Sequence, residues 1–409
     1  MEASLRQDEL SLSNKTKGCI LPWVHLFGTI RGDYRLCCYA EYVEPNIKLG
    51  TSDQSLTDVW NGKPMRNIRK AMLAGKVPYE CEKACYDRES LGDKSNRISS
   101  NIRFHHWAKL QKLTEEDGSI PTKPIYLDIR FGNLCNFRCR MCLPESSTSW
   151  YKEAREIDFL PEWTETKPID KYTDNQIFWD SLDDVAPYLL EVYFAGGEPF
   201  VQDGHYKLLE YLISKGYSKK ITLSYNTNLS YDKYKKFDLT EMWDNFKKVK
   251  LWPSCEGMGK RGEYSRKGLD WKKFERNVDK FSKHIDTISS VVSIWSITAM
   301  PDFILWLKKR NLNFYLTSLT GPPFASVTCL PKDAKITINK MYKSFMQKYG
   351  HLLNEHEVDN IKNILSYMNG RDDSHELQLF KAFNEKLDES RDESFLNTYP
   401  EFASWYKNI

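Results

Sequence analysis

From residue 124 onward, short apolar segments alternate with longer segments whose apolar residues recur every three or four positions. The short segments have the length and composition of buried strands, and the longer ones have the period of amphipathic helices. The predicted strands span residues 125–131, 189–195, 221–226, 249–254, 291–297 and 312–318. Strands that alternate with helices form right-handed parallel units. The pattern predicts an α/β fold, a partial (β/α)6 barrel with its site at the carboxyl ends of the strands.

The rest of the chain divides by the same criterion. A polar stretch rich in turn residues separates an N-terminal domain from the barrel, and the apolar spacing after Pro331 is helical to the end. A long segment that contains FLPEWTETKP is interpreted as an insertion or lid. The predicted divisions are a tail at 1–18, an N-terminal domain at 19–90, a linker at 91–122, the barrel at 123–330 with an insertion near 157–188, and a helical region at 331–409.

Charge and composition limit the possible partners and the compartment. Lysine and arginine total 59 against 56 acidic residues, without a basic arm, so a nucleic-acid partner is not expected. The N-terminus lacks an apolar signal core, and no run of 18 apolar residues could span a bilayer. We therefore expect a cytoplasmic protein with no membrane partner. Disulfides explain ten cysteines poorly in that compartment, so metal binding is the better interpretation.

Three cysteines follow the first predicted strand, in IYLDIRFGNLCNFRCRMCLP. Cys135, Cys139 and Cys142 stand at i, i+4 and i+7, so a tight loop would let three thiolates converge on one face of an iron–sulfur cubane. Closed clusters have four cysteine ligands. Three ligands would leave one iron open, as in metal sites that bind a substrate. The alternatives are coincidence and a zinc site that lacks its fourth ligand.

The ends of the next two strands carry groups suited to a small polar ligand. AGGEPF ends the second strand, where Gly196 and Gly197 allow a close approach of backbone and ligand. Glu198 can accept hydrogen bonds from an ammonium group. NTNL ends the third strand and offers the amides of Asn226 and Asn228 at the rim. These groups lie where the open iron of the cysteine loop is expected.

The CxxxCxxC loop resembles the signature of the radical S-adenosylmethionine (SAM) superfamily. The resemblance implies a 4Fe-4S cluster whose open iron chelates the amino and carboxylate groups of SAM. One electron then yields a 5'-deoxyadenosyl radical that abstracts hydrogen from a substrate. The GGEP element, which includes Pro199, is implied to contact the methionyl amine.

The fourth strand ends in PSCEG, and the resemblance extends to this segment and the one after it. It implies a ribose or carboxylate contact for Ser254. Arg266, or alternatively Arg261, would engage the methionyl carboxylate, a role that suits a guanidinium fork. Ser-x-Asp-Gly in the family is Ser-Cys-Glu-Gly here, which leaves the role of Glu256 open, and Cys255 is interpreted as a small buried residue.

The early cysteines resemble the SPASM/Twitch auxiliary-cluster domain. The pattern is Cys19-x12-Gly32-x4-Cys37, followed by a cysteine pair. The resemblance implies a second, closed 4Fe-4S cluster suited to electron transfer. In better-known members this domain follows the barrel, whereas here it precedes the barrel. Cys38 could replace Cys37, and a structural zinc site is the alternative. The implied ligands are Cys19, Cys37, Cys81 and Cys85.

The resemblance implies a radical SAM enzyme that carries out an oxidation, with a peptide or protein as the favoured substrate. A flavodoxin- or ferredoxin-type protein would donate the electron. A small molecule or nucleotide remains an alternative substrate, and a non-catalytic metal-cluster scaffold is the alternative class. Tyr225, Tyr264 and His205 lie near the expected rim, but an ordinary structural role is favoured for each, so no catalytic residue is assigned.

Overall fold

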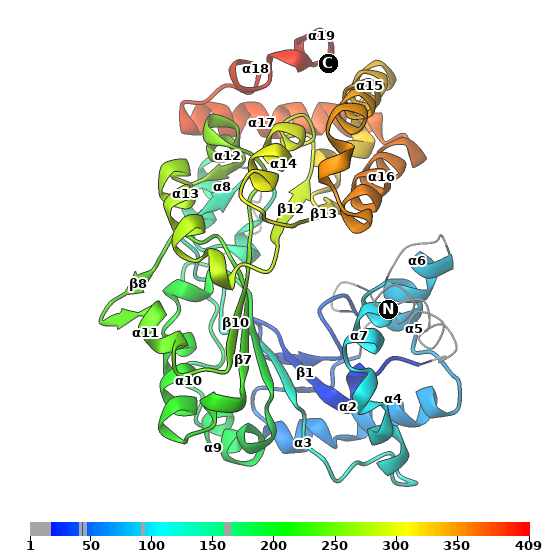
Figure 1. Ribbon diagram of the computed structural model, residues 1–409, viewed down its shortest axis with the longest axis vertical. Helices are drawn as coiled ribbons and strands as arrows, with labels where there is room; N and C mark the ends of the chain where they lie inside the picture. The colour runs from blue at the N-terminus through cyan, green and yellow to red at the C-terminus, as the bar shows by residue number, and fades with distance from the viewer. Residues whose placement is uncertain (1–17, 41–42, 44–46, 91–94, 159–164) are drawn as a thin grey trace.

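A seven-stranded sheet forms the centre of the molecule (Figure 1). The computed structural model describes residues 18–40, 43, 47–90, 95–158 and 165–409, so the predicted tail lies outside it except for its last residue. The strands, in the order β10-β7-β6-β4-β1-β2-β3, include four of the predicted ones as parallel neighbours. Their bounds are β1 His25–Gly28, β2 Asp33–Arg35, β3 Gly50–Thr51, β4 Tyr126–Ile129, β6 Glu191–Phe194, β7 Thr222–Thr227 and β10 Lys248–Pro253.

The last two predicted strands form a parallel pair of their own. These strands are β12 Ile288–Val292 and β13 Phe314–Ser318. Isolated parallel bridges join Leu251 to Ile285 and Ser254 to Ser289, next to the end of β10. β12 ends earlier than predicted, because the Ser293 N–H donates to the Ser296 hydroxyl at 2.9 Å. Local serine hydrogen bonds of this kind compete with strand pairing.

The strand β1 precedes the predicted linker in the sequence but joins the sheet of strands that follow it. It lies parallel to β4, with Phe27 opposite Asp128, and β2 continues antiparallel to β1. The N-terminal region and the α/β region therefore share one sheet. The described part of the linker contains the helix α7 (Asn96–Arg103) and a 3-10 helix (His105–Leu113).

Helices cover one face of the parallel strands, as α9, α10 and α11 do in Figure 1. On that face Val192, Phe194 and Leu223 are fully buried. Residues that alternate with them, such as Tyr193 and Trp252, are only half-buried. The helices are α9 Gln176–Val185, α10 Asp203–Ser214, α11 Leu239–Trp243, α13 Trp271–Lys280 and α14 Met300–Lys308. The predicted insertion thus includes an ordinary crossover helix, α9, while residues 159–164 lie outside the described residues.

The C-terminal region is helical, as predicted. α16 packs on β13, and Figure 1 shows α17 crossing the molecule near α12 and α8. Its helices are α15 Lys332–Tyr349, α16 Glu355–Gly370, α17 Leu377–Arg391, α18 Phe395–Thr398 and α19 Ala403–Tyr406. No helix in the described ranges is both long and apolar enough to cross a membrane.

Shorter elements complete the fold. Besides short 3-10 turns, the described residues form the α-helices α2 Leu21–Val24, α3 Leu56–Trp60, α4 Lys63–Leu73, α5 Tyr79–Cys81, α6 Asp87–Ser90, α8 Trp150–Glu156 and α12 Gly259–Ser265, and a π-helix Glu82–Tyr86. The remaining strands are β5 Arg138–Cys139, β8 Lys233–Tyr234, β9 Phe237–Asp238 and β11 Arg266–Lys267.

Candidate functional site

The three-cysteine loop begins directly after β4 and is held by a short antiparallel ribbon. β5, inside the loop, pairs with β11, so that Arg266 lies opposite Cys139. The Arg140 N–H continues this pairing by donating to the Ser265 carbonyl oxygen at 2.8 Å. The ribbon therefore brings the predicted arginine against one of the predicted cluster ligands.

The thiols of the loop have unequal acidity. A hydrogen bond between Cys139 and Cys142 lowers the pKa of Cys139, and the nearby Arg266 guanidinium lowers it further. The same bond raises the pKa of Cys142, and desolvation raises the pKa of Cys135 to about 12. The Arg266 Nη1 lies 3.8 Å from the Cys139 Sγ. Three thiols form a donor set that suits an iron–sulfur cluster, and the Arg266 cation offsets the negative charge that the thiolates bring to it.

The GGEP turn touches the cysteine loop directly. Gly196 and Gly197 have φ values of +79° and +53°, a region that favours glycine. A Cβ on Gly197 would overlap the Leu134 carbonyl oxygen, and that oxygen accepts the Glu198 N–H at 2.9 Å. The glycines are needed for the approach of these two backbones, which fixes Glu198 beside the loop.

Glu198 is buried among hydrogen-bond donors. Its carboxylate accepts the Thr227 hydroxyl at 2.7 Å, the Asn228 N–H at 2.6 Å and the Phe200 N–H at 3.1 Å. Burial outweighs these bonds and raises the pKa of Glu198 to about 7. The Asn228 amide also donates to the Asn136 side chain inside the cysteine loop at 3.0 Å. The second and third strand ends and the loop therefore form one hydrogen-bonded unit.

Arg266 has a counter-ion that sequence reasoning left undefined. Glu256 holds the Arg266 guanidinium through two hydrogen bonds, one of them 2.6 Å long, and both side chains are buried. Glu256 also accepts the Val291 N–H at 3.2 Å. The alternative arginine, Arg261, instead pairs with Glu401 at 3.0 Å. Arg266 therefore contacts a cysteine of the loop, whereas Arg261 pairs with an acid of the C-terminal region.

The other residues singled out by sequence lie around this unit. The Ser254 N–H donates to the Thr227 carbonyl oxygen at 2.8 Å, and Asn226 is half-buried on β7. Cys255 is fully buried and donates to the Gly257 carbonyl oxygen at 3.2 Å, as expected of a small buried residue. Tyr225 is buried against His205, with 3.0 Å between the hydroxyl and the ring Nε2.

Sequence reasoning missed two buried amides that hold the loop. The Gln202 side chain donates to the Gly196 carbonyl oxygen at 2.6 Å and to the Gly132 carbonyl oxygen at 3.2 Å. The Asn133 side chain donates to the Glu145 carbonyl oxygen at 3.0 Å and accepts the Ile169 N–H at 2.9 Å. Asn133 lies two residues before Cys135, and Gln202 lies three residues after Pro199. This nearness to the two motifs is the sequence signal that could have identified them.

The four N-terminal cysteines line one pocket. Their pKa values are raised by burial, to about 12 for Cys19 and Cys37. Cys38 is not among the lining residues. The lining residues are Cys19, Leu21, Leu36, Cys37, Ala40, Cys81, Ala84, Cys85, Asn96 and Arg97.

The donor set of this pocket suits a bulky cationic group. Buried thiols deprotonate only when a bound cation compensates the charge. Over the described residues, no three His, Cys, Asp or Glu side chains are grouped tightly enough for a single metal ion. Cys81 directly precedes the π-helix and Cys85 lies within it, and π-helices are frequent at functional sites.

Comparisons with known proteins bear on these two cysteine sets. Residues 19–86 match SPASM, described as an iron-sulfur cluster-binding domain. Streptococcus suis SuiB bound to S-adenosylmethionine is 16% identical, with a TM-score of 0.33 over 69% of this chain and 59% of that chain. SuiB bound to the precursor peptide SuiA is 15% identical, with a TM-score of 0.34 over 80% and 71% of the two chains. No curated protein matches this chain.

The SPASM match confirms the predicted iron–sulfur domain in the N-terminal region. The chain also carries the CxxxCxxC loop and the GGEP strand end of radical SAM proteins, in mutual hydrogen-bond contact. Residues 19–86 therefore match an iron-sulfur cluster-binding domain, and the loop and strand-end motifs resemble those of radical SAM proteins. The chain spans 59% of the SuiB chain in the first of these comparisons.

Proposed function

We propose that this protein binds SAM at a 4Fe-4S cluster held by Cys135, Cys139 and Cys142, and that it oxidatively modifies a peptide or protein. The observation that carries the proposal is the hydrogen-bonded unit of the cysteine loop, the GGEP turn and Asn228, with Arg266 opposite Cys139. A non-catalytic scaffold has no need of a buried carboxylate and a buried guanidinium beside three thiols.

The residues around the loop divide the recognition of SAM between them. When bound, the cluster supplies the electron that cleaves SAM. Glu198 accepts hydrogen bonds from the methionyl ammonium group, because its carboxylate lies at the strand end beside the loop. Arg266 engages the carboxylate of SAM, with Glu256 holding its guanidinium fork in orientation. Ser254 and Asn226 supply further polar contacts at the rim.

The SPASM pocket holds the second 4Fe-4S cluster in this proposal. Four buried thiols close its coordination sphere, so it serves electron transfer and does not bind substrate. Held by Cys19, Cys37, Cys81 and Cys85, the cluster would supply a one-electron acceptor for an oxidation. A flavodoxin- or ferredoxin-type protein reduces the first cluster, and the cytoplasm is the compartment in which such donors and reduced thiols occur together.

The uncovered face of the sheet supports a peptide substrate. We infer that the six parallel strands form the predicted partial (β/α)6 barrel, because two bridges connect β10 to the β12 region. Parallel sheets usually bury both faces. Here Tyr193 and Trp252 are half-buried on the face away from the helices, with ring centroids 5.6 Å apart, and Arg130 and Lys250 are also half-buried. Aromatic and cationic side chains provide contacts for an extended peptide.

Anaerobic reconstitution tests the proposed cofactors. We expect two clusters in the wild type, and loss of about half the iron when Cys135, Cys139 and Cys142 are all replaced by alanine. Cys255→Ala is the matched control, since it removes a buried thiol that binds no metal here. Zinc in place of iron at the four N-terminal cysteines would contradict the second cluster. Deuterium transfer from labelled candidate peptides into 5'-deoxyadenosine then tests the substrate class.

A further inference from the structure

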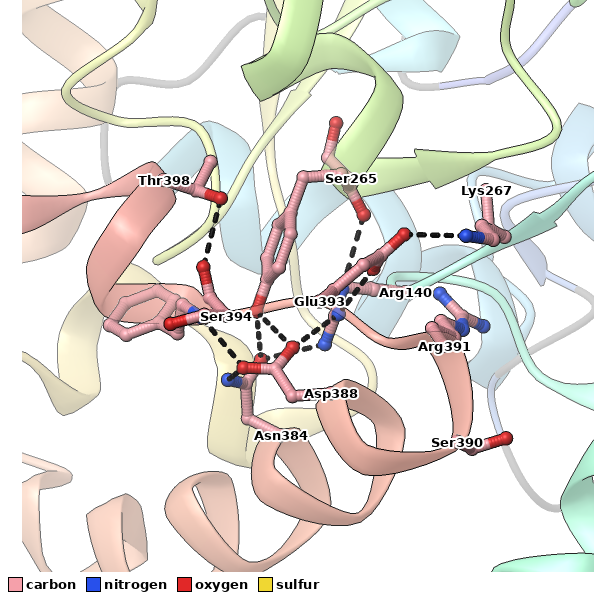
Figure 2. Close-up of polar contacts among 12 residues, drawn as sticks. Arg140, Ser265, Lys267, Asn384, Asp388, Ser390, Arg391, Glu393, Ser394 and Thr398 are labelled. Atoms are coloured by element: carbon pink, nitrogen blue, oxygen red, sulfur yellow. Dashed lines mark hydrogen bonds and ion pairs between the residues drawn. The ribbon is translucent and has the colours of Figure 1, made fainter.

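The cysteine loop is joined to the C-terminal region by a fully buried arginine (Figure 2). Arg140 stands between two of the proposed ligands, Cys139 and Cys142. Its guanidinium donates to the Asn384 side chain at 2.9 Å, to Asp388 at 2.6 Å and to Glu393 at 2.8 Å. Asn384 and Asp388 lie on α17, and Glu393 follows the end of that helix. These contacts connect positions about 250 residues apart in the chain, Arg140 and Glu393 being separated by 253.

Neighbouring side chains define the direction of Arg140. Its guanidinium lies 3.7 Å from the centre of the Tyr264 ring, and the Tyr264 hydroxyl donates to Asp388 at 2.7 Å. The Trp295 indole N–H donates to Asn384 at 2.8 Å. Figure 2 shows the Arg140 side chain directed toward Asn384, Asp388 and Glu393. An arginine with this many directional partners has one available orientation.

A second buried arginine makes the reverse connection. Arg391, at the end of α17, donates to the Arg138 carbonyl oxygen at 2.9 Å and pairs with Glu153 of α8 at 2.6 Å. The Trp150 indole N–H, also on α8, donates to the Cys139 carbonyl oxygen at 3.0 Å. Arg140 of the loop therefore bonds to α17, and Arg391 of α17 bonds to the loop.

Because side chains alternate along an extended strand, the anchoring of Arg140 also determines where the Cys139 thiol lies. Successive side chains of a strand point to opposite faces. Cys139 ends β5, and the Arg140 N–H continues the pairing, so drawing the Arg140 side chain toward α17 presents the Cys139 thiol on the other face. Buried ion pairs are weak contributors to stability compared with apolar packing, and their best-attested use is to select one arrangement.

We propose that α17 and the turn after it are a positioning element for the cluster-binding loop, and that Arg140 is the positioning residue through which Asn384, Asp388 and Glu393 act. This inference rests on the proposed function, because it assumes that the loop holds the SAM-binding cluster. The element would set the geometry in which the three thiols receive iron.

The test removes both acidic partners of Arg140 in the full-length protein. We expect Asp388→Asn/Glu393→Gln to lower iron at the loop and SAM affinity about 10- to 100-fold, as supporting partners of metal ligands do. Iron at the SPASM cluster should stay unchanged and serves as the internal reference. In the metal-free protein, amide hydrogen exchange of residues 135–142 should accelerate about tenfold or more. The matched control is Glu385→Gln/Glu389→Gln, which removes two charges from exposed positions of the same helix.

A third variant separates positioning from simple stability. Arg140→Leu in the Asp388→Asn/Glu393→Gln background removes the uncompensated buried charge. We expect it to recover the thermal stability and the SPASM cluster, while the loop exchange stays fast and the electron paramagnetic resonance spectrum of the reduced, SAM-bound protein stays altered. Recovery of wild-type loop exchange and spectrum would overturn the inference. If the wild type binds no cluster at the loop, the proposed function fails, whereas the exchange of the metal-free loop still decides whether α17 positions it.

Discussion

Glu198→Gln is expected to weaken SAM binding in a way that depends on pH. A carboxylate that accepts a hydrogen bond from an ammonium group contributes about 1.5–3 kcal/mol, or roughly 10- to 150-fold in Kd. The amide keeps the size of the side chain but loses the charge, so we expect this full effect at pH 8. There the wild-type carboxylate is ionised, because burial raises its pKa only to about 7.

The sign of the pH dependence follows from the raised pKa. At pH 6 about one-tenth of the Glu198 side chains in the free protein are ionised, so the wild-type Kd should rise about tenfold between pH 8 and pH 6. Glutamine does not titrate, so the Kd of the variant should not show this tenfold rise between pH 8 and pH 6. The advantage of the wild type should therefore shrink about tenfold at the lower pH.

Equilibrium dialysis with the oxidised, reconstituted protein measures both constants without turnover. Iron content and thermal unfolding at each pH serve as controls for an intact cluster and fold. Parallel pH profiles for the two proteins would refute the reasoning, since they would show that Glu198 does not exchange its proton for the ammonium group of SAM.

Three further predictions concern the same two sites. Gly197→Ala should cost about 1–3 kcal/mol more than Gly216→Ala, because both have positive φ but only Gly197 would overlap Leu134; chemical denaturation measures the difference. Glu256→Gln should raise the potential of the loop cluster by leaving Arg266 uncompensated, as a redox titration would show. Assembly of the SPASM cluster should slow as pH falls, because its buried thiols have raised pKa values; visible absorbance follows it.

Each of these predictions has a contradicting result. Equal destabilisation by the two alanine substitutions would show that the GGEP turn tolerates a side chain beside the cysteine loop. An unchanged potential in Glu256→Gln would place its charge outside the influence of the cluster. Assembly at a constant rate between pH 8.5 and pH 6.5 would mean that the four thiols are already ionised.

Local patterns in the sequence were sufficient for the α/β strands and the motif residues. Apolar periodicity located the six strands, with β12 shifted because Ser293 and Ser296 bond to each other. No strand was predicted for β1, whose partner β4 lies about 100 residues away in the sequence. The parallel pairing of β1 with β4 is a property of the tertiary structure.

In the candidate site, too, local patterns predicted some residues, while the contacts between distant residues depended on the tertiary structure. Cys135, Glu198 and Asn228 were identified from spacing at strand ends, where parallel strands bring distant residues together. The pairing of Glu256 with Arg266 was not evident, because spacing does not reveal which acid faces which base. The contact of Arg140 with α17 has no local signal at all, since it depends on how the C-terminal helices pack.

The formation of 5'-deoxyadenosine tests the central claim most directly. The reconstituted protein is reduced with dithionite under anaerobic conditions and supplied with SAM, and the product is measured by mass spectrometry. We predict deoxyadenosine from the wild type and none from the variant with Cys135, Cys139 and Cys142 replaced by alanine. A wild-type protein that contains its loop cluster and yields no deoxyadenosine would contradict the account.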